Sequence, residues 1–283
     1  MTRRPTSAYK GLAHQTCRDA MTAALALFAV ALSPIDARAQ FCAQPTAMRF
    51  EVTSKIVRSR IGFTQGLEFR DGQLYESTGN VGETTKLNVI ALDGTVKTLA
   101  DQDRRVFGEG LTILNDEIVQ ITWQEREVFV YDISGKLKRR MKNPRDGWGL
   151  SNDGTNLLFT DGGPLLHYAD PATFKILKSV KISASNAPEV DGVNELEMVD
   201  GKLYGNIFMT RNIVRLDPVS GCIGAVADLS VLWEIMTPDE AAATRSQENV
   251  LNGIAHDPAT GLFYVTGKRW KVIFVGRFRD VAP

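Results

Sequence analysis

A short phrase recurs five times along this chain of 283 residues, and the same pattern of turns and apolar pairs follows each copy. The phrase is a variable residue, usually a glycine, and then Leu or Ile. The copies are Gln65-Gly66-Leu67, Glu109-Gly110-Leu111, Trp148-Gly149-Leu150, Asn194-Glu195-Leu196 and Asn252-Gly253-Ile254. Self-similarity of this kind indicates one supersecondary unit that is repeated, with each unit packed against the next.

The distance between copies selects among the repeat folds. The first residues of successive copies are between 39 and 58 positions apart, near the period of β-propeller blades built from short strands. We therefore predict an all-β chain that folds as a five-bladed β-propeller. Residues 48–58 are expected to form a strand that completes the last blade as its outer edge. Between blades four and five, Thr237-Pro238 predicts a short helical insertion that is capped by Thr237.

The first residue of each copy is expected to lie at one mouth of the central channel, because the inner strands of a propeller surround its axis. We call these five the head residues: Gln65, Glu109, Trp148, Asn194 and Asn252. Glycine at the next position favours close packing around the axis. Four hydrogen-bonding side chains would then meet one indole, and Glu109 is the ring's only carboxylate. A purely structural role in a water-filled channel is the alternative.

A second group of side chains is predicted at the same mouth, because the second strand of each blade returns there antiparallel to the first. This group consists of Trp123, Phe208 and Lys268, and two further aromatic residues, Phe63 and Phe107, precede the first two heads. One acid, one lysine, several amides and an aromatic wall are typical of a pocket for a small polar substrate.

Glu76 is a rival acid, placed just beyond the apolar pair of the first blade. We interpret it as a structural carboxylate that accepts backbone N–H groups together with Ser77 and Thr78.

Composition and charge exclude several classes of function. The formal net charge is +0, with 43% hydrophobic and 23% charged residues, which describes an ordinary globular chain. A nucleic-acid partner is not expected, because phosphate binding requires clustered Lys and Arg. The three histidines lack the spacing of a zinc site, so no metal and no cofactor are predicted.

The first 39 residues are predicted to be a signal peptide. A basic start precedes an apolar run over residues 20–32, and Ala37-Arg38-Ala39 supplies a cleavage pattern. The run is shorter than the roughly 20 residues of a membrane span, although a retained anchor is the alternative. Residues 40–283 would then be a single domain that is exported to the periplasm or secreted, a monomer without membrane attachment. Export leaves Cys42 and Cys222, which we expect to form one disulfide.

Several motifs, in this order, resemble the glutaminyl-peptide cyclotransferases of plants and bacteria. They are Phe63-Thr64-Gln65-Gly66-Leu67, Tyr75-Glu76-Ser77-Thr78-Gly79, Phe107-Gly108-Glu109-Gly110-Leu111, Thr122-Trp123, Gly147-Trp148-Gly149-Leu150, Asn194-Glu195-Leu196-Glu197, Leu251-Asn252-Gly253-Ile254-Ala255 and Thr266-Gly267-Lys268-Arg269-Trp270. The resemblance covers residues 48–276. It implies a five-bladed propeller without a catalytic metal, which converts the N-terminal Gln of peptides or proteins to pyroglutamate and releases ammonia.

The resemblance also implies roles for individual residues. The family's functional positions fall on Phe63, Gln65, Phe107, Glu109, Trp148, Asn194 and Lys268. Glu109 matches the proposed acid–base residue, and we group Lys268, Asn194 and Gln65 with it as catalytic. The aromatic residues Phe63, Phe107, Trp148, Trp123 and Phe208, with Asn252, are predicted to bind substrate. Phe208 departs from the family, which often has Trp there.

Two other functions compete with this interpretation. A calcium-dependent propeller hydrolase or lactonase would place the head residues around a metal, although one carboxylate is few for calcium. A non-catalytic exported propeller could use the same aromatic residues to bind a peptide. Resistance to chelators tests the first alternative, and ammonia release from a peptide that begins with Gln tests the second.

Overall fold

The computed structural model describes residues 42–79, 84–185 and 187–282. The chain divides into two units, Met1–Ala39 and Gln40–Pro283, and every described residue belongs to the second. The predicted signal peptide therefore lies outside the described residues. Within the described ranges, no helix combines the length and the apolar character that crossing a membrane requires.

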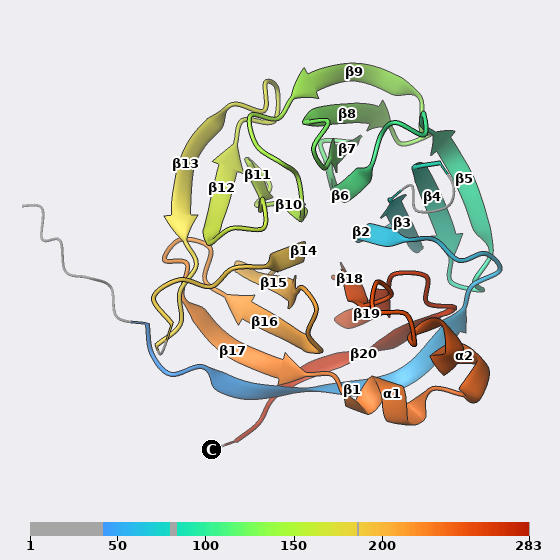
Figure 1. Ribbon diagram of the computed structural model, residues 1–283, viewed down its shortest axis with the longest axis vertical. Coiled ribbons are helices and arrows are strands. Elements are labelled where there is room, and N and C mark those ends of the chain that lie inside the picture. Colours follow the sequence, from blue (N-terminus) through green and yellow to red (C-terminus); the bar gives the residue numbers. More distant parts are fainter. Residues whose placement is uncertain (1–41, 80–83, 186, 283) are drawn as a thin grey trace, which may run out of the picture. The chain divides into compact units, whose positions relative to one another are not determined.

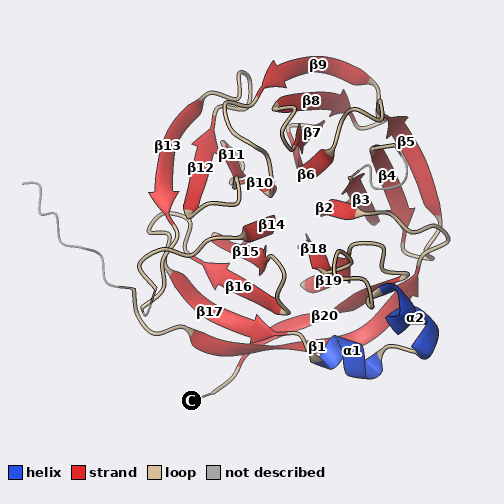
Figure 2. Ribbon diagram, viewed as in Figure 1, coloured by secondary structure: helices blue, strands red, loops and turns tan. Residues whose placement is uncertain are grey.

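The second unit is almost entirely β-structure (Figure 2), and three of its sheets are four-stranded with antiparallel neighbours. The first contains β2 (Thr64–Arg70), β3 (Gln73–Thr78), β4 (Lys86–Ala91) and β5 (Val96–Asp101). The second contains β6 (Gly108–Leu114), β7 (Glu117–Thr122), β8 (Glu127–Asp132) and β9 (Leu137–Lys142). The third contains β10 (Leu150–Asn152), β11 (Leu157–Phe159), β12 (Leu165–Ala169) and β13 (Ile176–Lys181).

The remaining strands form one eight-stranded sheet in the order β14-β15-β16-β17-β1-β20-β19-β18. Its strands are β14 (Val193–Val199), β15 (Lys202–Ile207), β16 (Asn212–Leu216), β17 (Ile223–Asp228), β1 (Thr46–Val57), β20 (Val272–Asp280), β19 (Leu262–Gly267) and β18 (Leu251–Asp257). Strand β1 pairs antiparallel with β20 along most of its length, as the sequence predicts for a strand that completes the last repeat. It also pairs in parallel with β17 through Thr46, Ala47 and Met48, which joins the two halves of the sheet.

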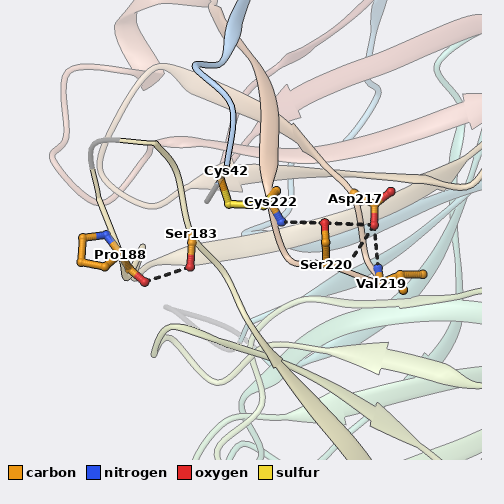
Figure 3. The surroundings of a disulfide bond; sticks show 7 residues. All are labelled: Cys42, Ser183, Pro188, Asp217, Val219, Ser220 and Cys222. Atoms are coloured by element: carbon orange, nitrogen blue, oxygen red, sulfur yellow. Dashed lines mark hydrogen bonds between the residues drawn. A yellow bond between two sulfur atoms is a disulfide. The ribbon is translucent and has the colours of Figure 1, made fainter. Parts of the chain in front are cut away.

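A disulfide between Cys42 and Cys222 lies just before this junction, with the two Cα atoms 5.4 Å apart. Figure 3 shows the bond beside a turn in which Asp217 accepts hydrogen bonds from the N–H groups of Val219 and Ser220. The start of β1 is thus attached to the turn before β17 by a covalent bond as well as by strand pairing.

The strands β2, β6, β10, β14 and β18 lie nearest the centre of this unit, and β5, β9, β13 and β17 lie at its outside (Figure 1). Each of these inner strands contacts the next around the centre. Glycine makes this approach possible: a Cβ atom on Gly66 would lie 2.4 Å from the backbone nitrogen of Leu111, and one on Gly149 would lie 1.8 Å from the carbonyl oxygen of Asn194. The close packing that the repeat predicts at this position is confirmed.

Apolar side chains fill the spaces between neighbouring sheets. One cluster, for example, joins Ile121 and Val128 of the second sheet to Leu157 and Phe159 of the third, and all four are buried. Burial of such aliphatic and aromatic side chains contributes about 1.5–3 kcal/mol each, and it holds the inner strands at fixed positions around the centre.

Two short helices, α1 (Val231–Ile235) and α2 (Pro238–Ala243), lie between β17 and β18. Thr237 caps α2: its side chain accepts a hydrogen bond from the N–H of Glu240, and the Glu240 carboxylate accepts one from the N–H of Thr237. Glu240 also pairs with Lys55 of β1 at 2.8 Å. Residues 244–250 then lead from α2 back to the inner strand β18.

Candidate active site

Four of the five head residues lie where the pairing of an inner strand with its neighbour changes register. The shifts fall between Thr64 and Gly66, Gly108 and Leu111, Val193 and Leu196, and Leu251 and Ile254. Such irregularities redirect a side chain out of the regular alternation of a strand. In the third repeat β10 begins only at Leu150, so Trp148 precedes it and donates its N–H to the carbonyl of Thr160 at 3.0 Å.

These irregularities surround a cavity of about 360 Å³ at one end of the inner strands. It is lined by Phe63, Gln65, Phe107, Glu109, Trp123, Trp148, Asn194, Phe208, Glu248 and Lys268. Both groups of side chains that the sequence predicts at the channel mouth are thus brought together. Asn252 differs from this expectation, and Glu248 was not predicted.

Aromatic rings form most of the wall of the cavity. The ring centroids of Phe107 and Trp123 are 5.7 Å apart, and those of Trp148 and Phe208 are 5.3 Å apart, both in edge-to-face geometry. Two glycines make room for the rings, since a Cβ atom on Gly79 would lie 2.5 Å from the Phe107 ring, and one on Gly162 would lie 2.7 Å from that of Trp148. The wall is preorganised by this packing rather than assembled from mobile side chains.

Glu109 and Lys268 are the charged centre of the cavity, and both are almost completely buried, at 5% and 4% exposure. Burial raises the pKa of Glu109 well above its usual value, while the charge of Lys268 lowers it and that of Glu125 raises it. Burial lowers the pKa of Lys268, and the carboxylates of Glu109 and Glu248 raise it. The Lys268 ammonium also lies 5.2 Å and 5.0 Å from the ring centroids of Phe63 and Phe208.

Amide side chains line the floor beside this pair. The Oδ1 atom of Asn194 is buried and has no hydrogen-bond partner among the described residues, so it is available to a ligand. Asn252 lies behind Gln65 rather than on the cavity wall: its Nδ2 group donates to the carbonyl of Thr64 at 3.1 Å and to Oε1 of Gln65 at 3.2 Å. With its oxygen held in this way, Gln65 directs its amide nitrogen elsewhere. Asn252 therefore orients Gln65 and does not itself contact the space.

Comparison with known proteins gives a consistent result. The family model for glutamine cyclotransferases matches residues 23–278. The chain belongs to the glutamine cyclotransferase family. It is 32% identical over 230 residues to a glutaminyl-peptide cyclotransferase of Arabidopsis thaliana, covering 79% of this chain and 69% of the relative. A crystal structure of glutaminyl cyclase from Myxococcus xanthus superposes with a TM-score of 0.75 at 29% identity, covering 84% of this chain and 100% of that one.

One residue of the cavity wall, Glu248, was not predicted from the sequence. It lies in residues 244–250, between α2 and β18, and its side chain is exposed. This segment has no counterpart in the other repeats, so alignment of the copies carries no information about it. The only available signal was its position just before the Asn252 head.

Glu76 has a structural environment, as expected, but its partners are side chains rather than backbone N–H groups. Its Oε1 atom accepts from Arg58 and from Thr64, both at 2.6 Å, and Oε2 accepts from Asn88 at 2.9 Å. Arg58 in turn donates to the carbonyl of Trp270. This buried ion pair connects the end of β1 to the first and last repeats.

Among the residues that the structure describes, no group of three or more His, Cys, Asp or Glu side chains is arranged to hold a metal ion. At the cavity, Glu109 and Glu248 are the carboxylates of the wall, and the charged residue that lines it with them is Lys268. A cation beside such an acid is suited to proton transfer and to stabilising negative charge.

Proposed function

We propose that this chain is a glutaminyl-peptide cyclotransferase that converts the N-terminal Gln of peptides or proteins to pyroglutamate. Its membership of the glutamine cyclotransferase family supports this proposal. The observation that carries it is a buried carboxyl group, Glu109, that shares an aromatic-walled cavity with the buried cation of Lys268.

The reaction is an attack of the peptide's own α-amine on its γ-carboxamide carbon. A C–N bond forms to close a five-membered lactam, and the bond to the amide nitrogen breaks to release ammonia. Because nucleophile and electrophile belong to one residue, holding the folded conformer supplies a large part of the acceleration. A cavity of about 360 Å³ with rigid aromatic walls is suited to select that conformer.

Glu109 would carry the proton between the two nitrogen atoms. Its raised pKa makes the carboxylate a stronger base than an exposed one, so it can accept the proton of the attacking amine. The resulting carboxylic acid would then donate that proton to the leaving nitrogen, which departs as neutral ammonia. One group thus serves as base and acid, and it ends in its starting state.

Lys268 and the amide side chains would stabilise and orient the reacting group. Negative charge develops on the γ-carboxamide oxygen during the attack, and a buried cation stabilises such charge more strongly than it does in water. Gln65 and Asn194 are suited to bind the polar atoms of the substrate, since Asn194 Oδ1 lacks another partner in the described part of the chain.

The decisive experiment measures ammonia release and product mass with a peptide that begins with Gln. The proposal predicts one ammonia for each pyroglutamyl peptide, and full activity in excess EDTA, because every proposed step uses side chains alone. Activity that is lost in EDTA and restored by calcium or zinc would instead favour a metal-dependent enzyme. Tight binding of the peptide without ammonia release would indicate a non-catalytic propeller.

We further propose that the second unit is a five-bladed β-propeller with a helical insertion between blades four and five. The five inner strands and their five copies of one phrase support this blade count, with the eight-stranded sheet regarded as two blades joined by β1. The basic and apolar N-terminal segment and the disulfide support export to the periplasm or beyond, and we propose a monomer.

A further inference from the structure

A second hollow adjoins the active-site cavity across part of its rim. Its walls come from the loop between β15 and β16, from α1, and from the segment before β18; they comprise Met209, Thr210, Arg211, Trp233, Thr244, Ser246, Gln247, Asn249, Val250 and Leu251. We call this hollow, of about 350 Å³, the outer groove. The groove and the cavity adjoin at two places. Phe208 lines the cavity and Met209 lines the groove; likewise Glu248 lines the cavity, and its chain neighbours Gln247 and Asn249 line the groove.

Packed side chains of Arg211, Trp233 and Trp270 support the outer groove. The Arg211 guanidinium lies 4.5 Å from the ring centroid of Trp233, and this indole meets that of Trp270 edge to face at 5.0 Å. Trp270 is fully buried and donates its Nε1–H to the carbonyl of Asn249 at 2.9 Å. Packing of this kind keeps the groove open without a ligand.

One buried polar atom of the groove is left without a partner in the described part of the chain. Asn249 is only 8% exposed, and its Nδ2 group donates to the carbonyl of Ala243 at 2.6 Å, yet its Oδ1 atom has no hydrogen-bond partner in the described ranges. A buried acceptor without a donor destabilises the folded state, and a donor from a ligand would supply the missing hydrogen bond. Beside it, the side chains of Ser246 and Gln247 are exposed on the same segment.

The hollow on another side of the cavity has a different character. It is lined by charged residues that include Asp103, Arg105, Glu127 and Arg140. These are already paired with one another, Arg105 with Asp103 at 2.9 Å and Arg140 with Glu127 at 3.7 Å. Of these two hollows beside the cavity, only the outer groove includes a buried side-chain atom without a hydrogen-bond partner among the described residues, Oδ1 of Asn249.

We propose that the outer groove is a subsite for the peptide chain that follows the N-terminal Gln. This inference rests on the proposed function, in which only the first residue reacts and the rest of the peptide must leave across the rim. An extended peptide advances about 3.3 Å per residue, so residues two to four span about 10 Å beyond the cavity. Their main chain presents N–H and C=O groups, which match the acceptor of Asn249 and the polar side chains of Ser246 and Gln247.

A series of amidated substrates tests this subsite in the full-length protein. Glutamine amide, Gln-Ala amide and Gln-Ala-Ala-Ala amide share the reacting residue and differ only in the chain beyond it. We expect kcat/KM to rise about tenfold from the two-residue to the four-residue substrate, the effect of one or two main-chain hydrogen bonds. Equal kcat/KM for all lengths would overturn the subsite and leave the proposed function intact, whereas no turnover of any of them would overturn both.

A variant that fills the groove makes the test specific. Ser246→Trp places an indole at the exposed groove wall, and Ala242→Trp is the matched control on the exposed face of α2, outside the residues that line groove or cavity. The ratio of kcat/KM between four-residue and two-residue substrates should fall about tenfold in Ser246→Trp and remain unchanged in Ala242→Trp. An unchanged ratio in a folded Ser246→Trp protein, or an equal fall in the control, contradicts the subsite. If Ser246→Trp does not fold, the length series with the unaltered protein still decides.

Discussion

Carboxyl groups are buried at the mouth of the cavity and also deeper between the inner strands, and their hydrogen-bond partners differ. At the mouth, Glu109 faces a cavity and has a lysine as its charged neighbour. Further along the inner strands, Glu195 accepts hydrogen bonds from the N–H groups of Leu67 and Ile254, at 3.0 Å and 2.7 Å. Glu197 accepts from the N–H of His256 at 2.9 Å. These deeper carboxyl groups connect the inner strand β14 to β2 and β18.

The comparison shows that a raised pKa does not by itself identify a catalytic group. Burial raises the pKa of Glu195 and Glu197 well above the usual value, as it does for Glu109, and it raises that of Glu68 to about 7. Structural networks perturb pKa values as strongly as active sites do. Open space alone does not distinguish Glu109 either, since Glu68 and Glu197 line a hollow of about 250 Å³. The difference lies in the partners: the carboxyl groups of Glu195, Glu197 and Glu68 accept hydrogen bonds from backbone N–H groups, whereas Glu109 shares an aromatic-walled cavity with the charge of Lys268.

The largest difference between Glu109 and the deeper carboxyl groups should appear in the turnover rate. Glu109→Gln keeps the size of the side chain but cannot shuttle a proton, so kcat should fall by about 10²–10⁴-fold with a modest change in KM. The measurement is the rate of ammonia release at saturating substrate, with thermal unfolding to establish that the variant is folded.

Two structural carboxylates serve as controls for that variant. Glu195→Gln replaces one of two oxygens that accept from backbone N–H groups, so it should reduce the free energy of unfolding by about 1–3 kcal/mol. Glu76→Gln also leaves the buried Arg58 guanidinium without its counter-charge, so its cost should be about 3–5 kcal/mol. Both variants should change kcat far less than Glu109→Gln does. If Glu76→Gln abolishes turnover in a folded protein while Glu109→Gln stays near the unaltered rate, the assignment of the proton-transfer group is wrong.

Removal of the cation at the mouth should have the next largest effect. Lys268→Met keeps the aliphatic stem between Phe63 and Phe208 and removes the charge, so kcat should fall by about 10–10³-fold. Lys268 lowers the pKa of Glu109, and its loss should therefore move the rising limb of the kcat–pH profile to higher pH. A profile that stays at the same pH would show that the two groups do not interact during turnover.

A third prediction concerns the disulfide beside the junction of β1 with β17. Reduction should lower the free energy of unfolding by about 2–4 kcal/mol, because the bond restrains a long loop in the unfolded chain; the two cysteines are 180 positions apart. Denaturant unfolding with and without reductant measures this, and kcat should not change, since the bond is remote in the fold from the cavity residues. Two titratable thiols in the native oxidised protein would show that the bond is absent.

Much of the candidate site could be predicted from the repeat, for a physical reason. Equivalent residues of stacked units occupy equivalent positions around one centre, so aligning the copies placed Glu109, Trp148 and Asn194 together without any knowledge of contacts. The glycine at the next position was equally informative, because a side chain there would collide with the neighbouring strand.

The remainder depends on contacts that no alignment of copies reveals. Glu248 lies in a segment unique to one repeat, and the shift of Asn252 behind Gln65 follows from a hydrogen bond between two heads. The parallel pairing of β1 with β17, which merges two sheets, was likewise not expected. The alignment of the copies thus predicted the backbone position of each head residue, whereas contacts with neighbouring residues determined the orientation of its side chain.

The smallest effect we predict concerns stability at the deep end of the inner strands. Burial raises the pKa of Glu68 to about 7, while a hydrogen bond from Thr112, the N–H of Ile113 and the charge of Arg70 act in the opposite direction. The folded state therefore binds a proton more tightly than the unfolded chain. This contribution to stability is complete below the unfolded pKa, near 4.5, and is lost as the pH rises through about 7.

Glu68→Gln keeps an oxygen that accepts from the N–H of Ile113, a bond of 2.9 Å in the structure, but it cannot ionise. Between pH 5 and pH 8 the unaltered protein should lose on the order of 1–2 kcal/mol more unfolding free energy than the variant, an amount reduced by the partial exposure of the side chain to solvent. Denaturant unfolding of both proteins at the two pH values measures the difference. Because Glu68 is on β2 and is not among the residues that line the active-site cavity, kcat should keep the same pH dependence in the variant. Parallel stability curves for the two proteins would mean that Glu68 remains ionised in the folded state, held in that form by its backbone donor.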